Sequence, residues 1–113
     1  MLLVNSSQYN FQYGNRIHFP YSIAMLETFL QSNDHINQNF KFEKTFVFRE
    51  HVEENINKCK NSDILLCSCY VWNWEITIHL AKQVKKINPN CLIIFGGPQV
   101  PEDTTGFFEK HPF

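Results

Sequence analysis

Short apolar runs alternate along the chain with segments in which apolar residues recur at every third or fourth position. Four runs have the length of a strand and lie at residues 2–4, 42–48, 64–70 and 91–95. The helical spacing between them predicts helices at about 20–31, 50–59 and 74–87, with a last helical turn at 107–108. Strands that alternate with helices over short connections indicate a parallel sheet covered by helices.

Two polar segments interrupt this pattern, and we expect both to be loops. Residues 5–15 are rich in Asn, Gln and Tyr and are long for a connection between a strand and a helix. Residues 32–39 begin with Ser-Asn-Asp, which indicates a turn or loop. The run 64–70, by contrast, is apolar almost throughout, which is typical of a central strand buried on both faces.

Residues at the helix ends support these boundaries. Pro20 suits the first turn of the first helix. In the second helix, Glu53 and Glu54 come early and Lys58 comes late, as the helix dipole prefers. Asn73 can cap the third helix. Each predicted helix therefore carries a start or stop signal as well as an apolar stripe.

Few topologies accommodate four parallel strands with right-handed crossovers. The flavodoxin-like order 2-1-3-4 is the first choice, which gives a Rossmann-like, three-layer α/β/α domain over residues 1–113. A sheet of this kind usually has a fifth strand, and no further apolar run follows residues 91–95. Either the chain is a fragment of a longer protein that holds the fifth strand, or the sheet has an uncovered edge that needs a partner.

Charge and hydropathy exclude several classes of function. The net charge is −1, so the charge balance gives no support for binding nucleic acid. No apolar run reaches the length of about 18 residues that a membrane span needs. The apolar start at residues 2–4 is too short for a signal peptide and lacks a basic beginning, so we do not expect it to be one. The four cysteines are Cys59, Cys67, Cys69 and Cys91, and three of them lie in or beside apolar runs. This favours small buried residues in a reducing cytoplasm over the disulfides of a secreted protein.

The sequence lacks the familiar catalytic and phosphate-binding motifs. It contains neither GxGxxG nor GxxxxGK[ST], its cysteines do not have the spacing of a zinc or iron–sulfur site, and its histidines are scattered. The apolar flanks of Cys69 would raise the pKa of its thiol rather than activate it. We therefore expect no catalytic residue and no metal ligand in this chain.

Three loops are expected to meet at the switch point between the first and third strands, where open parallel sheets bind ligands. Residues 6–19 are polar, residues 68–73 are aromatic, and residues 96–101 begin with Gly-Gly-Pro, where backbone can approach a ligand closely. Each loop alone also fits a plain explanation: a solvated loop, helix packing or a tight turn. Their coincidence favours a binding site, whose candidates from the loops alone are Ser6, Gln8, Tyr9, Asn10, Cys69, Val71 and Gln99.

The last half of the chain resembles a known family. Residues 63–73, DILLCSCYVWN, resemble the S-x-Y-x-W-N segment of cobalamin-binding domains in radical SAM proteins. Residues 80–89 resemble the helix that follows in those domains, and residues 93–101, IIFGGPQVP, resemble their GGPxVP loop. The resemblance covers residues 60–113 closely and residues 1–59 in general pattern. It implies a B12-binding domain that precedes a radical SAM barrel.

The resemblance also implies a cofactor, partners and further site residues. The cofactor is cobalamin, whereas the 4Fe–4S cluster and S-adenosylmethionine belong to a downstream domain that this chain lacks. The residues implied to contact the corrin are Ser68, Tyr70, Trp72, Asn73, Gly96, Gly97 and Pro98. The DxHxxG motif of other B12 domains is absent, as is common in the radical SAM branch, and Gln99 stands where many relatives have His. The alternative is a structural or interaction module of the same fold that packs on a catalytic domain with its site empty.

Overall fold

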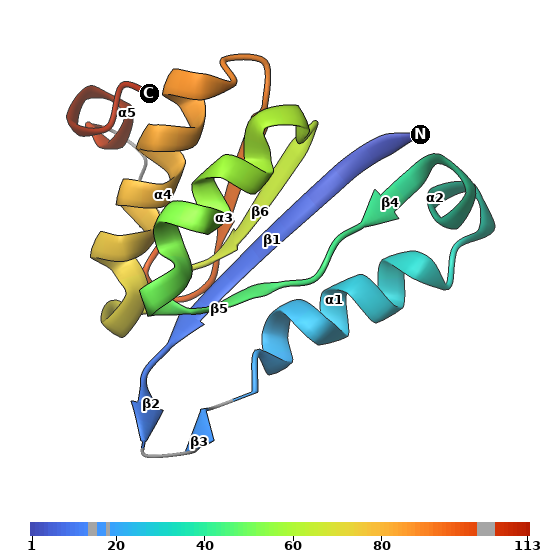
Figure 1. Cartoon of the computed structure of the whole chain (residues 1–113), viewed down its shortest axis with the longest axis horizontal. Coiled ribbons are helices and arrows are strands. Elements are labelled where there is room, and N and C mark those ends of the chain that lie inside the picture. The colour runs from blue at the N-terminus through green and yellow to red at the C-terminus, as the bar shows by residue number, and fades with distance from the viewer. Residues whose placement is uncertain (14–15, 18, 102–105) are drawn as a thin grey trace.

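The computed structural model describes residues 1–13, 16–17, 19–101 and 106–113 of the chain (Figure 1). The strands are β1 (Leu2–Asn10), β2 (Gln12–Tyr13), β3 (Arg16–Ile17), β4 (Phe40–Phe42), β5 (Phe46–Phe48), β6 (Ile64–Ser68) and β7 (Leu92–Gly96). The helices are α1 (Tyr21–Gln31), α2 (Asp34–Asn39), α3 (Val52–Lys58), α4 (Trp74–Ile87) and α5 (Phe107–Lys110), with 3₁₀ turns at Arg49–His51, Cys59–Asn61 and Val71–Asn73. The helices expected from the spacing of apolar residues are confirmed.

The main sheet is parallel and has the order β4-β1-β6-β7, with β5 also paired to β1. Ser7 of β1 lies between Phe46 and Cys67 on its two neighbours, and Ser68 of β6 lies opposite Gly96 of β7. The expected α/β class and the neighbours of each strand are therefore confirmed. The sheet differs at its edge, where the single strand expected at 42–48 is two short strands separated by residues 43–45.

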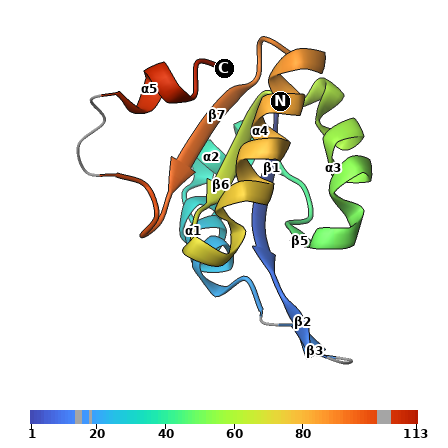
Figure 2. The same ribbon diagram turned by 90° about the vertical axis from the view of Figure 1, so that its left-hand side faces the viewer.

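Helices cover both faces of this sheet. α3 and α4 lie side by side on one face, and α1 and α2 lie on the other (Figures 1 and 2). α5 packs beside α4 and β7, where the Phe107 ring is centred 6.2 Å from Trp74 and 6.5 Å from Phe95. No helix in the described part of the chain is long and apolar enough to cross a membrane.

The hydrophobic core lies between the sheet and the α3–α4 layer. Leu80 and Val84 point inward from α4 because they are one helical turn apart, and they meet Leu65 of β6 and Ile56 of α3. The four cysteines belong to the same layer as free, buried thiols. Burying a large aliphatic side chain contributes roughly 1.5–3 kcal/mol, so this layer holds the sheet and the two helices together.

The polar stretch after the first apolar residues is a strand, and the expectation of a long loop there is wrong. β1 continues to Asn10, and every residue from Val4 to Asn10 is buried. Several of its polar side chains are stable in the interior because they find partners on the covering helices: Ser6 donates to Glu27 of α1, and Tyr9 accepts from Asn55 of α3. Residues 14 and 15, at the end of the expected loop, lie outside the described residues.

Two other boundaries also differ from expectation. Residues 34–39, expected as a turn or loop, form α2, because the Asn33 side chain caps its first turn by accepting from Ile36 N at 3.2 Å. The third strand ends at Ser68 rather than at residue 70, since Tyr70 begins the turn that leads into α4.

Candidate functional site

The carboxyl ends of β1, β6 and β7 lie next to one another in the sheet, so the segments that follow them share one edge of the molecule. Cys69, just after β6, donates its amide to the carbonyl of Gly96 at 2.7 Å, and its own carbonyl accepts from Gln99 N at 3.2 Å. The loops after β6 and β7 are therefore bonded to each other. This is the edge at which the sequence placed a binding site.

An aromatic pair stands at this edge. The rings of Tyr70 and Trp72 stack with their centroids 4.5 Å apart and 10° between their planes. Trp72 donates from Nε1 to Asn10 Oδ1 at 3.1 Å, and the Tyr70 hydroxyl lies 2.6 Å from Ser22 Oγ at the start of α1. Trp72 is nevertheless 43% exposed. The pair is thus held in place by β1 and α1 while part of the indole remains open to a ligand.

The Asn73 side chain joins the ends of β1 and β6 beneath the aromatic pair. Its Nδ2 donates to the carbonyls of Tyr9 and Ser68 at 3.1 and 3.0 Å, and its Oδ1 accepts from Tyr70 N at 2.8 Å. The side chain is fully buried and makes no bond onto the amides of α4. The expected role as a cap of α4 is therefore wrong, because the side chain turns back to join the ends of β1 and β6.

The two glycines after β7 have different surroundings. Gly97 has a φ of +105°, and a Cβ there would lie 2.6 Å from the carbonyl oxygen of Cys69. Glycine is required at this position because the loop passes against the backbone of Cys69, just after the end of β6. A Cβ on Gly96 would meet nothing within 4 Å. Only Gly96 therefore presents open space to a ligand.

The structure brings some of the predicted residues together at the edge and leaves others inside the sheet. Those at the edge are Asn10, Tyr70, Val71, Trp72, Gly96, Gly97, Pro98 and Gln99. Ser6, Gln8 and Tyr9 are buried along β1: Gln8 Oε1 accepts from Ile23 N at 3.3 Å, and Ser6 bonds Glu27 at 2.7 Å. Ser68 and Cys69 are buried behind the edge, and burial raises the pKa of the Cys69 thiol to about 12.

Arg49 belongs to the same edge and was missed by the sequence analysis. Its guanidinium donates from an Nη atom to the Trp72 carbonyl at 2.9 Å and lies 4.5 Å from the centroid of the Phe11 ring. The predicted strand order could have indicated Arg49, because it placed the end of the second strand beside the first. The expected site comprised only the loops after the first, third and fourth strands.

Within the described residues, histidine, cysteine and acidic side chains form no metal-binding cluster at this edge. Among the described residues, no three of them are placed so that they could hold a metal ion. The arrangement consists instead of a stacked aromatic surface, exposed glycine backbone and amide side chains, which suits a broad ligand with an apolar face and polar rim.

Comparison with known proteins bears on the nature of that ligand. No protein-family model matches the chain. The chain is 35% identical over 94 residues to the cobalamin-dependent radical SAM methyltransferase TokK of Streptomyces tokunonensis. It is 30% identical over 94 residues to the 2-(S-pantetheinyl)-carbapenam-3-carboxylate methyltransferase of Streptantibioticus cattleyicolor.

The chain is related to cobalamin-dependent radical SAM proteins. The family resemblance expected from residues 60–113 is thereby confirmed, and the matched region, 83% of this chain, extends it well into the first half. The chain spans only 14% of the length of each of these relatives. The match to the cobalamin-dependent radical SAM family thus concerns a small part of much longer proteins.

Proposed function

We propose that this chain is the cobalamin-binding domain of a radical SAM enzyme and holds the corrin at the carboxyl edge of its sheet. The observation that carries the proposal is the stacked pair of Tyr70 and half-exposed Trp72 at that edge, in a chain related to a cobalamin-dependent methyltransferase. A corrin is a broad, largely apolar plate bordered by amides, so an indole face and exposed backbone are suitable partners for it.

Within this proposal the edge residues have distinct roles. Trp72 offers its face to the plate, and its orientation is fixed by the bond to Asn10 and by Arg49 on its carbonyl. Gly96 leaves room for close approach, whereas Gly97 and Asn73 maintain the shape of the loops. Cobalamin, when bound, would supply the methyl-group chemistry of the parent enzyme, and this chain's part is binding and orientation. The 4Fe–4S cluster, S-adenosylmethionine and the reaction are assigned to a radical SAM domain elsewhere in the parent protein.

The alternative function is a structural module of the same fold that binds no corrin. It is favoured by the buried polar residues of β1, since Ser6, Gln8 and Tyr9 are all engaged inside the domain rather than turned to a ligand.

Cobalamin binding separates these two functions. The purified chain is mixed with hydroxocobalamin, desalted, and measured by visible absorption. We expect a retained cobalamin spectrum, which is lost in Trp72→Ala and in Gly96→Val. Phe108→Ala, which removes an exposed ring on α5, is the matched control and should bind as the unchanged chain does.

A colourless, folded wild-type chain would establish the structural module instead. Retention of the spectrum by Trp72→Ala would remove the aromatic surface from the proposal. Circular dichroism of each variant shows whether a loss of binding is a loss of fold.

A further inference from the structure

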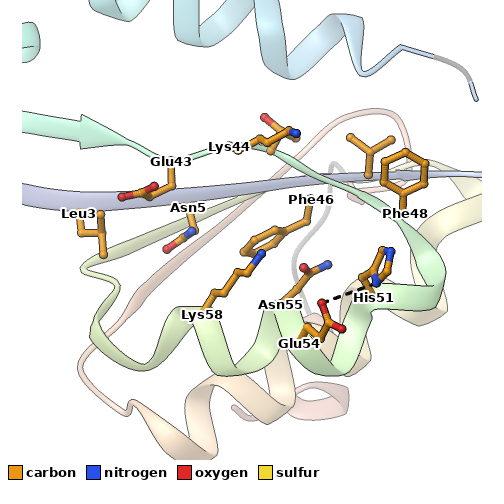
Figure 3. A pocket seen from close by; sticks show the side chains of 12 residues that line it. Leu3, Asn5, Glu43, Lys44, Phe46, Phe48, His51, Glu54, Asn55 and Lys58 are labelled. Carbon is orange, nitrogen blue, oxygen red and sulfur yellow. Dashed lines mark ion pairs between the residues drawn. The ribbon is translucent and has the colours of Figure 1, made fainter.

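A hollow lies on the flank of the domain, beside residues 43–45, which separate the edge strands β4 and β5. It has a volume of about 520 Å³ and opens between β1, the segment 43–48 and α3 (Figure 3). None of its lining residues belongs to the carboxyl edge assigned to the corrin. The volume is within the range of about 300–1,000 Å³ typical of small-molecule sites.

The floor of this hollow contains a polar atom without a hydrogen-bond partner among the described residues, the Oδ1 of Asn5. Its side chain points from β1 toward α3 into the hollow (Figure 3), and it is only 3% exposed. Its Oδ1 atom is buried and has no hydrogen-bond partner among the described residues. Because a buried carbonyl without a donor is costly, an N–H group from a ligand would compensate it there. Asn55, the other buried amide at this wall, is already engaged through Nδ2 to Tyr9 at 2.8 Å.

The rim of the hollow carries two lysines that can meet an anion. Glu43 is paired with Lys41 at 3.3 Å, whereas Glu54 lies 3.6 Å from His51, which lies equally close to Glu50 and is charged only when protonated. Lys58 and Lys44 take part in no ion pair within the described part of the chain. Lys58 reaches from α3 toward the ring of Phe46 (Figure 3). The ammonium group of Lys58 therefore lies beside an aromatic wall.

We propose that this hollow is a second binding site, for a small aromatic or heteroaromatic acid that carries an N–H donor. The N–H group bonds Asn5, the ring lies along Phe46, and the carboxylate meets Lys58. The site is separate from the carboxyl edge assigned to the corrin, because its walls share no residue with that edge. The inference therefore stands whether or not the chain binds a corrin.

The test uses three related probes on the whole chain, followed by two-dimensional NMR of amide groups. 4-Aminobenzoate has the ring, the acid and the N–H donor, benzoate lacks the donor, and 4-aminobenzamide lacks the charge. We expect saturable shifts of the Phe46, Asn55 and Lys58 signals with 4-aminobenzoate, and binding at least about fivefold weaker for each of the others, since each lacks one charged or buried hydrogen bond. Equal affinities, or no saturable shift with 4-aminobenzoate, would overturn the proposal.

Substitutions locate the site. Lys58→Gln removes the charge at an exposed position, and Asn5→Leu removes the buried acceptor while keeping the branching and the number of heavy atoms of the side chain. Both should weaken binding of 4-aminobenzoate about tenfold. Lys60→Gln, a nearby exposed lysine outside the lining, is the control and should leave it unchanged. If Lys60→Gln weakens binding as much as Lys58→Gln, the interaction is general attraction to surface charge. Displacement of the probe by excess hydroxocobalamin would also refute a separate site.

Discussion

Gly96 and Gly97 show that neighbouring residues of one motif have unrelated functions. The Gly-Gly-Pro sequence was interpreted as a place where backbone approaches a ligand, and a tight turn was the alternative. Gly97 fits the tight turn, because its positive φ and its contact with the Cys69 backbone are internal to the domain. Gly96 fits the other interpretation, since a Cβ there would meet nothing within 4 Å. The sequence could not assign the two roles, because the neighbour that excludes a Cβ at Gly97 is Cys69, which is distant along the chain.

Substituting each glycine by alanine is therefore expected to give opposite results. Gly97→Ala should lower the free energy of unfolding by more than about 1 kcal/mol, because the new Cβ meets backbone atoms at a backbone conformation that L residues disfavour. Gly96→Ala should change it by less than about 0.5 kcal/mol. Urea unfolding followed by tryptophan fluorescence measures both. Equal stabilities of the two variants would contradict the assignment.

At the scale of elements, β1 is the strand that the sequence pattern could not predict in full. The alternation of β1 could not be recognised, because nearly every residue on both of its faces after Val4 is polar. The groups that make this tolerable, Glu27 on α1 and Asn55 on α3, are far away in the sequence. The helices and the buried strands β6 and β7 were predictable, because their apolar patterns depend on local spacing alone. The same holds for the candidate site. Its aromatic and glycine loops were predictable from the sequence, whereas the polar residues of β1 were wrongly expected in a loop.

The contact between β1 and α1 predicts a pH dependence. Ser6 Oγ donates to Glu27 Oε1 at 2.7 Å, and burial raises the pKa of Glu27 above its ordinary value, although that bond opposes the rise. The folded state therefore binds this proton more tightly than the unfolded state does. The resulting stabilisation is complete below the ordinary pKa of glutamate and is lost as the pH rises through the raised value.

Glu27→Gln should remove this dependence, since glutamine still accepts the bond from Ser6 and carries no charge. We expect the variant to be more stable than the unchanged chain at neutral pH and to differ less at acidic pH. Urea unfolding across about pH 4 to 8 measures this, with the exposed Glu109→Gln as the control. Parallel pH curves for Glu27→Gln and the unchanged chain would disprove the raised pKa.

At the scale of the whole molecule, the four cysteine thiols share one core layer, so their accessibility shows whether that layer is folded. They come from segments separated along the chain, yet all are buried between the sheet and the α3–α4 layer. Burial raises the pKa of Cys59 and Cys69 to about 12 and also raises those of Cys67 and Cys91. Each thiol is therefore both protonated and shielded at neutral pH, as the apolar flanks indicated for Cys69.

This arrangement predicts that the cysteines become reactive together. With a chromogenic disulfide reagent at neutral pH, we expect negligible reaction of the native chain and complete reaction of all four thiols over the same range of urea in which fluorescence reports unfolding. Reaction of one thiol well before that transition would show that its segment opens separately. Mass spectrometry of the labelled peptides identifies which thiol has reacted.

The divided edge strand has a consequence for behaviour in concentrated solution. β4 and β5 are each three residues long, and the chain leaves the sheet between them, so that edge is a poor template for adding a strand from another molecule. β7, on the other side, is an unbroken apolar strand paired only with β6 among the described residues. Any strand exchange or fibril growth by this chain should therefore begin at β7, and a charged substitution such as Ile94→Lys would suppress it.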